Sequence, residues 1–255
     1  MIQLKAALNH AKNAKRIAQK VEVGHLTRNQ VTPARNDRLS LSALGELLDY
    51  TVRGGSGKYS TPERLIGLRR YLIAAVATLG RPDSILDISV RPNRSQWLAE
   101  DRRLDLNPAG RVQTKKYRAV LPVGDVFAEW LNSTTDWFVC AHRRETDPAT
   151  GESSLRQIGL DSVRSAWDTA RDHLKLPAGW GTRLLRHSVA TILANRGINP
   201  VELKIAMGHE PIVGTTARYV IFDPSYLVSF QRLVDELFDE LSRMAPAALI
   251  FPSAR

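Results

Sequence analysis

The chain is 255 residues long and 43% hydrophobic, which is enough for one full core and a small second unit. Its 36 lysines and arginines exceed its 26 acidic residues, so the net charge of +10 makes phosphate a natural counter-ion for part of the surface. The single cysteine, Cys140, excludes a disulfide framework and a cysteine-based zinc site. The sequence has no signal peptide and no apolar run long enough to span a membrane, which predicts a cytoplasmic protein.

An amphipathic helix is expected near the N-terminus. Apolar residues recur at three- and four-residue spacing through residues 4–21, with the lysines and Arg16 off this stripe. The following residues, 22–38, are polar, include Gly24 and Pro33, and show no clear period, which indicates a linker. One helix cannot form a core, so residues 1–38 are expected to be separate from a larger domain at 39–255.

Two further helices are expected next. Ser40 precedes an apolar series at 41–52, so it is a candidate N-cap, and the glycine-rich run 54–57 should end this helix. Residues 61–63, Thr-Pro-Glu, should begin the second helix with proline in its first turn. The apolar run 71–79 predicts that the second helix is largely buried.

The pattern changes to short β-prone pieces between residues 104 and 123. We expect a small antiparallel sheet made of residues 104–106, 111–114 and 118–123, with a turn at 107–110 and Lys115 and Lys116 near the second turn. Cys140 ends the run Trp-Phe-Val-Cys, which favours a buried strand thiol. Helices are expected to resume at 126, 160–174, 184, 200 and 224–244. The predicted fold class is therefore mainly α with a small antiparallel β-sheet.

The most specific pattern lies between Thr182 and Tyr219. It contains Arg-His-Ser-Val-Ala-Thr at 186–191, Met-Gly-His-Glu-Pro-Ile at 207–212 and Thr-Thr-Ala-Arg-Tyr at 215–219. In this order the pieces resemble the catalytic end of the tyrosine recombinase, or phage integrase, family, which commonly shows H-x-L-R-H-x-x-A-T, L-G-H-x-x-I and T-x-x-Y. The stretch Thr-Leu-Gly-Arg at 78–81 resembles the family's T-G-x-R-x-x-E-x-L, although Ser84 replaces the acidic residue. The resemblance covers roughly residues 39–255.

The resemblance implies strand transfer on double-stranded DNA without a metal or other cofactor. Such a reaction needs a nucleophile, cations on the non-bridging phosphate oxygens, and an acid for the departing 5′ oxygen. Tyr219 would be the nucleophile, with Tyr226 as the fallback. Lys115 would protonate the leaving oxygen, and Lys116 is the alternative because the register of the turn is open.

The remaining implied site residues bind phosphate. Arg81 and Arg186 would hold it, since a guanidinium matches two phosphate oxygens and stays charged. His209 would donate a hydrogen bond to the same phosphate. Three residues before Arg186 the family usually has histidine, and this chain has Arg183, which can donate from the same helix face but cannot act as a base. His187 is expected to have a structural role.

Residues 39–255 are therefore expected to be the catalytic domain of a site-specific DNA recombinase that forms a 3′-phosphotyrosine intermediate. Residues 1–38 would be the last helix of a core-binding domain plus a linker. The family implies a homotetramer on DNA, nucleoid-associated when bound, and the apolar stripe after Pro224 suits a C-terminal helix that packs on a neighbour. Two alternatives stay open: a type IB topoisomerase, and a catalytically degenerate DNA-binding protein of the same fold.

Overall fold

The computed structural model describes residues 2–19, 21, 37–57, 60–114, 116–146, 151, 153–209 and 224–251. The chain divides into two units, Met1–Asp37, which contains α1 (Ile2–Asn13), and Arg38–Arg255. The helices of the second unit are α2 (Leu41–Arg53), α3 (Pro62–Thr78), α4 (Pro82–Leu86), α5 (Asp125–Asn132), α6 (Arg164–His173), α7 (Arg183–Asn195), α8 (Pro200–Ala206), α9 (Val228–Met244) and α10 (Pro246–Leu249), with short 3-10 turns η2 (Pro92–Arg94) and η4 (Pro224–Tyr226). Its strands are β1 (Trp97–Leu98), β2 (Arg103–Asp105), β3 (Val120–Pro122), β4 (Cys140–Thr146) and β5 (Ser153–Gly159).

Helix α1 ends earlier than the apolar periodicity predicts. The expected helix covers residues 4–21, but α1 ends at Asn13 and Lys15 has a left-handed backbone with φ of 54°. A left-handed residue interrupts the helical hydrogen-bond ladder. Ile17 and Ala18 of the expected stripe therefore lie beyond the helix.

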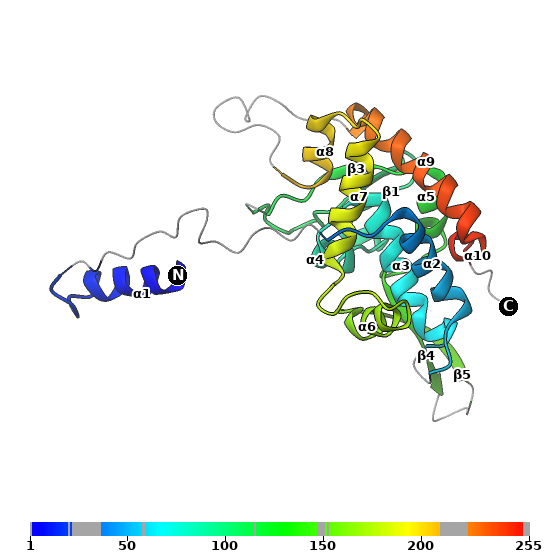
Figure 1. Ribbon diagram of the computed structural model, residues 1–255, viewed down its shortest axis with the longest axis horizontal. Helices are drawn as coiled ribbons and strands as arrows, with labels where there is room; N and C mark the ends of the chain where they lie inside the picture. Colours follow the sequence, from blue (N-terminus) through cyan, green and yellow to red (C-terminus); the bar gives the residue numbers. More distant parts are fainter. Residues whose placement is uncertain are drawn as a thin grey trace. The chain divides into compact units, whose positions relative to one another are not determined.

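Helix α3 is the buried centre of the second unit. Every residue from Leu65 to Thr78 is buried, and α2, α4, α5, α6, α7 and β4 all pack against this helix (Figure 1). Two expected helix starts are confirmed: Ser40 Oγ accepts a hydrogen bond from Ala43 N at 3.1 Å before α2, and α3 begins at Pro62. Although α3 is strongly apolar, no helix in the described part of the chain has the length and hydropathy to cross a bilayer.

The small antiparallel sheet forms, but not from all the expected pieces. Its strand order is β1-β2-β3. The prediction of a strand at residues 111–114 is wrong, because these residues are irregular. The side chain of Gln113 explains the difference: its Nε2 donates to Arg118 O at 3.0 Å, and its Oε1 accepts from Arg118 N at 3.1 Å. A side-chain amide thus takes the place of strand pairing, and β3 begins only at Val120.

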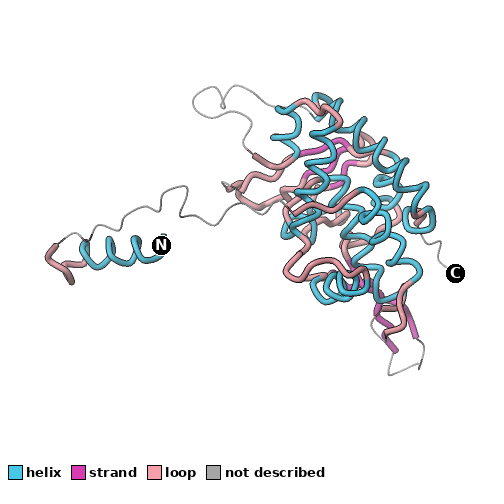
Figure 2. Tube along the Cα trace, in the orientation of Figure 1, coloured by secondary structure: helices cyan, strands magenta, loops and turns pink. Residues whose placement is uncertain are grey.

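Strands β4 and β5 form a hairpin that projects away from the helices (Figure 2). The expected buried thiol is confirmed, since Cys140 lies at the start of β4 and is fully buried. The hairpin itself was not predicted. Its outer part carries exposed charged side chains such as Arg143 and Arg156, so the sequence lacks the alternation of apolar and polar residues that marks a half-buried strand.

The C-terminal helices α9 and α10 pack on their own chain. Leu233, Leu237 and Leu241 of α9 are buried, and α9 contacts α2, α5 and α7. Beyond α9, Trp130 Nε1 donates to Leu249 O at 2.6 Å. These leucines are therefore covered by their own chain, and packing of the C-terminal helix on a neighbouring protomer stays a prediction.

Candidate active site

The candidate site is built around the C-terminal end of α8. This helix ends in a Schellman motif, in which Gly208 N donates to Ile205 O at 2.7 Å and His209 N donates to Lys204 O at 3.0 Å. Gly208 has φ of 60°, and a Cβ atom at this position would lie 2.4 Å from Tyr117 O. Glycine is needed here both for the left-handed backbone and for the close approach of the segment before β3.

Arg81 joins this helix end to two other segments. It is the N-cap residue of α4, so it lies just after the end of α3. Its Nη1 donates to Tyr117 O at 2.9 Å, and its Nη2 donates to Gly208 O at 3.2 Å. Ser84, which stands where the family has an acidic residue, donates to the Arg81 carbonyl at 2.8 Å. The Arg81 guanidinium therefore links the start of α4, the segment before β3 and the end of α8.

Arg186 lies in the first turns of α7 and is 7% exposed. Its Nη1 donates to Leu79 O at 2.6 Å, and its Nη2 donates to Met207 O. Leu79 is the C-cap of α3 and Met207 is the C-cap of α8. Carbonyls at the C-terminal ends of helices have no intrahelical partner and carry the negative end of the helix dipole. Arg186 thus satisfies the ends of two helices at once.

Four of the six predicted site residues lie within electrostatic range of one another. Burial, and then the charges of Arg81 and Arg183, lower the pKa of Arg186 to about 10. Burial and Arg183 also lower the pKa of Arg81. Partial loss of hydration, followed by the charges of Arg186, Arg81 and Lys204, lowers the pKa of His209. The structure therefore brings Arg81, Arg183, Arg186 and His209 together into one cationic cluster.

The hydrogen-bond partners of Arg81 and Arg186 are carbonyls. Within the described residues, no carboxylate forms an ion pair with Arg81, Arg183 or Arg186, whereas Arg94 and Arg118 both pair with Asp87. A hydrogen bond to a carbonyl leaves the net charge of a guanidinium in place. Two of the three arginines also lie near the N-terminal end of α7, where the helix dipole disfavours cations and favours anions. The cluster is therefore suited to a bound anion.

The other two predicted residues, Lys115 and Tyr219, lie outside the described residues. Lys116, the alternative to Lys115, is exposed and directly precedes the residue whose carbonyl holds Arg81. Residues 210–223, which include Tyr219, lie between His209 and η4. Tyr226, the fallback nucleophile, is in η4 and is 52% exposed.

The two helices that flank residues 210–223 are fixed to each other. Asn199 N, before α8, donates to Ser229 Oγ at 3.2 Å. Phe230 N, in the first turn of α9, donates to Glu202 Oε2 at 2.8 Å. Glu202 is buried, so its carboxylate caps the N-terminal end of α9 from a neighbouring helix. The helix before the segment that carries Tyr219 and the helix after it are thus fixed to each other.

Two residues beside the cluster were not predicted. Arg38 was expected to belong to the linker, but its Nε donates to Thr191 Oγ1 on α7 at 2.8 Å. Burial, followed by the charges of Arg38, Arg183 and Arg186, lowers the pKa of His187, so Arg38 lies near this ring as well. A helix-face argument could have found Thr191, because residues 183, 187 and 191 share one face of α7.

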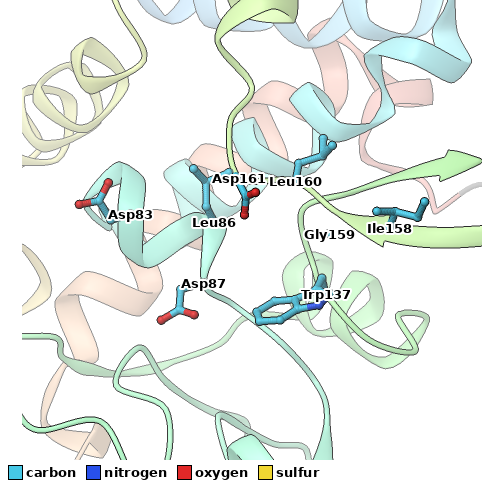
Figure 3. A pocket seen from close by; sticks show the side chains of 8 residues that line it. All are labelled: Asp83, Leu86, Asp87, Trp137, Ile158, Gly159, Leu160 and Asp161. Carbon is cyan, nitrogen blue, oxygen red and sulfur yellow. The ribbon is translucent and has the colours of Figure 1, made fainter.

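A cavity of about 520 Å³ lies between α4 and the base of the β4–β5 hairpin (Figure 3). Trp137 and Leu160 line it together with the carboxyl groups of Asp83, Asp87 and Asp161. Carboxylates repel phosphate, so the cluster, and not this cavity, is the candidate nucleic-acid site. Over the described residues, no group of three or more His, Cys, Asp or Glu side chains is placed to hold a metal ion.

Known proteins resemble the chain in structure. No family model and no curated protein matches it. The integrase from mycobacterium phage Brujita is similar, with a TM-score of 0.51 and 18% identity over 95% of this chain and 74% of that one. The integrase of the Tn1549 transposon in complex with transposon right end DNA is also similar, with a TM-score of 0.53 and 15% identity over 90% of this chain and 76% of that one.

The chain has the tyrosine-recombinase fold. The predicted fold class, mainly α with a small antiparallel sheet, is thereby confirmed. At 15% to 18% identity the likeness concerns the fold, and the roles of individual residues have to be argued from the geometry of the site.

Arg183 is the main departure from the tyrosine-recombinase pattern. It is the first residue of α7 and exposed, and it precedes Arg186 by three residues, so both side chains leave the same side of the helix. Its charge contributes to the lowered pKa of both Arg81 and Arg186. In this tyrosine-recombinase fold a permanent cation therefore occupies a position where the family usually has a titratable group.

Proposed function

We propose that the protein is a site-specific recombinase that cuts and rejoins double-stranded DNA through a 3′-phosphotyrosine intermediate. The observation that carries this proposal is the cluster of three arginines beside His209. Arg81 and Arg186 are held by carbonyls, and none of the three arginines has a paired carboxylate in the described residues. Guanidinium groups bind phosphate oxygens through paired hydrogen bonds. Their existing hydrogen bonds fix Arg81 and Arg186 before DNA arrives, which is what stabilisation of a transition state requires.

In the proposed reaction, Tyr219 Oη attacks the phosphorus in line as the P–O5′ bond breaks. The phenol releases its proton to solvent water, helped by the nearby cations that stabilise the phenolate, and the leaving 5′ oxygen takes a proton from Lys115 or from its neighbour Lys116. The arginines balance the charge on the non-bridging oxygens, and His209 donates a hydrogen bond to one of them. The phosphotyrosyl ester keeps the energy of the broken bond, so a 5′-hydroxyl of a partner strand can reverse the step.

The position of Tyr219 in the chain supports its role. It follows His209, a member of the cluster, by ten residues. An extended chain spans up to about 3.3 to 3.6 Å per residue, so the phenol can reach a phosphate held by the cluster. The intervening segment joins two helices, α8 and α9, that are hydrogen-bonded to each other.

Covalent capture on nicked duplexes tests the proposal. A pool of nicked duplexes should leave a covalent DNA adduct on the wild-type protein, and sequencing of the captured DNA would identify the target site. Tyr219→Phe removes only the phenolic oxygen, so it should abolish the adduct while non-covalent binding stays within a few-fold. Tyr226→Phe is the matched control and should retain the adduct. An adduct that persists in Tyr219→Phe and maps to Tyr226 would refute the assignment.

A DNA-binding protein of the same fold that does not cleave is the second candidate. Arg183 favours it, because a guanidinium cannot serve as the acid or base that a histidine provides at this position. This candidate predicts salt-dependent DNA binding by the wild-type protein without an adduct from any duplex. Covalent capture therefore separates it from the recombinase.

We further assign residues 1–37 to the last helix of a core-binding domain and its linker, and the rest of the chain to the catalytic domain, which moves Arg38 out of the expected linker. The division of the chain at Asp37 and Arg38 supports this assignment. We also propose assembly as a homotetramer on two DNA sites. Since the apolar stripe of α9 is covered by its own chain, other surfaces would make the protomer contacts. Light scattering on the purified DNA complex tests the stoichiometry.

A further inference from the structure

A second group of polar side chains continues along α7 beyond the cluster. Arg183, His187 and Thr191 recur every four residues, so they share one face of this helix. Arg38 lies across this face, because its Nε donates to Thr191 Oγ1 at 2.8 Å. At about 1.5 Å per residue, Thr191 lies about 12 Å along the helix from Arg183.

Two hydroxyl groups of α7 fix the chain at this point. Thr191 Oγ1 donates to His187 O at 2.7 Å while it accepts from Arg38. One turn earlier, Ser188 Oγ accepts from Leu39 N at 2.8 Å, and Leu39 is buried. The backbone is thus anchored directly beside Arg38, whereas the Arg38 side chain lies on the surface. A side chain that is already ordered loses little conformational entropy when it binds a ligand.

This group extends the positive charge of the cluster. Besides burial, the groups that lower the pKa of His187 are three cations, Arg38, Arg183 and Arg186. The Arg38 guanidinium and the His187 imidazole both have N–H groups that can donate to phosphate oxygens, whereas the Thr191 hydroxyl, which donates to His187 O, serves to hold Arg38. A phosphate is therefore the ligand that this surface favours.

We propose that Arg38, held in place by Thr191, forms with His187 a second phosphate-binding subsite on α7, for the DNA strand that leads to the phosphate held by the cluster. The inference rests on the proposed function in that DNA is the ligand. The contact would position the strand without reading its sequence, because phosphates are the same at every step.

A salt titration of DNA binding tests the subsite. The probe is a duplex of arbitrary sequence, bound by the full chain between about 50 and 200 mM salt. Each neutralised phosphate contributes about 0.9 to the slope of log affinity against log salt. Arg38→Gln should therefore lower the slope by about 0.9 and weaken binding on the order of threefold to tenfold. Arg38→Lys should keep the slope, because it keeps the charge.

Two controls separate a phosphate contact from net charge and from folding. Arg232→Gln removes one charge from an exposed arginine that pairs with Glu236 on α9, and it should leave the slope unchanged. Thr191→Val removes the hydroxyl that holds Arg38, so it should weaken binding in the wild type and add nothing in Arg38→Gln. Thermal unfolding of each variant checks that it is folded during the titration.

The outcomes distinguish this inference from the proposed function. An unchanged slope in Arg38→Gln, an equal loss in Arg232→Gln, or a wild-type protein that binds no duplex at low salt overturns the subsite. A wild type that forms the Tyr219 adduct while Arg38→Gln binds normally leaves the proposed function standing without the subsite. A slope reduced in Arg38→Gln alone, in a protein that forms no adduct, supports the subsite and refutes the strand transferase.

Discussion

Gly208→Ala tests whether the end of α8 positions Arg81. The chain offers a matched control in Gly197, since both glycines are left-handed residues that end a helix with the same pair of hydrogen bonds, with φ of 60° and 76°. They differ in the space available. A Cβ at Gly208 would lie 2.4 Å from Tyr117 O and 3.1 Å from Arg81 Nη1, whereas a Cβ at Gly197 meets no described atom within 4 Å.

The difference in available space determines how much unfolding free energy each variant should lose. A left-handed alanine costs about 1 to 2 kcal/mol, and this term applies to both variants. The contact of 2.4 Å at Gly208 forces the Tyr117 carbonyl to move, and overpacking of this kind costs about 1 to 3 kcal/mol more. Gly197→Ala should therefore lose about 1 to 2 kcal/mol of unfolding free energy, and Gly208→Ala about 2 to 5 kcal/mol. Tyr117 O is also the acceptor for Arg81, and misplacement by about 1 Å can cost about 100-fold in rate.

Denaturant unfolding and single-turnover cleavage of a nicked duplex measure the two effects separately. Gly197→Ala should unfold at lower denaturant but cleave at nearly the wild-type rate. Gly208→Ala should lose both stability and cleavage, at a temperature where both variants are folded. Equal losses of stability would refute the steric argument. Normal cleavage by Gly208→Ala would refute the claim that the end of α8 positions Arg81.

Three other predictions follow from the cluster. Arg186→Ala should reduce cleavage more than Arg81→Ala, each by about 100-fold or more, because Arg186 is the more buried donor; near-normal single-turnover rates would contradict this. The pKa of His209 lies below its ordinary 6.5, so below this pH the folded protein binds fewer protons than the unfolded chain. The contribution of His209 to the free energy of unfolding should therefore be complete above about pH 6.5 and decrease as the pH falls below that value. NMR titration of the ring should show this low pKa and an increase on DNA binding, and a value that DNA leaves unchanged would argue against a phosphate contact. Chelation should leave cleavage unchanged, and strict dependence on added divalent metal would point to another mechanism.

The features that the sequence predicted well are those decided by near neighbours in the chain. The start of α2 depends on one hydroxyl and an amide three residues later, and the start of α3 depends on the fixed φ of Pro62. The long apolar run of α3 indicates burial on all sides wherever the helix lies in the fold. Such signals need no knowledge of tertiary contacts.

Features that depend on distant partners could not be predicted in this way. The side-chain amide of Gln113 binds the backbone of Arg118 where strand pairing was expected, and β-propensity does not predict such a bond. The sequence alone does not show whether the amphipathic face of α9 packs on a neighbour or on its own chain. In the fold its leucines are buried and α9 contacts α2, α5 and α7, which lie far from it in the sequence. In the site, the resemblance to the recombinase motifs predicted that Arg81 and Arg186 are site residues, because the residue type matches at these positions. The sequence could not predict their hydrogen-bond acceptors, because these are backbone carbonyls, which every residue type has.

The repulsion among the cations of the cluster lowers the stability of the folded protein when no anion is bound. Burial and the charges of Arg81 and Arg183 lower the pKa of Arg186 to about 10, which corresponds to about 3 kcal/mol of unfavourable interaction in the charged state. Arg183 adds charge near the same helix end, where the dipole also opposes it. An anion that binds only the folded state adds stability in proportion to the logarithm of its concentration over Kd, so a phosphate would offset this cost. Carbonyl partners leave the charge available for that anion, whereas an acidic neighbour would have neutralised it. The same arrangement therefore predicts that a bound phosphate raises the stability of the folded protein.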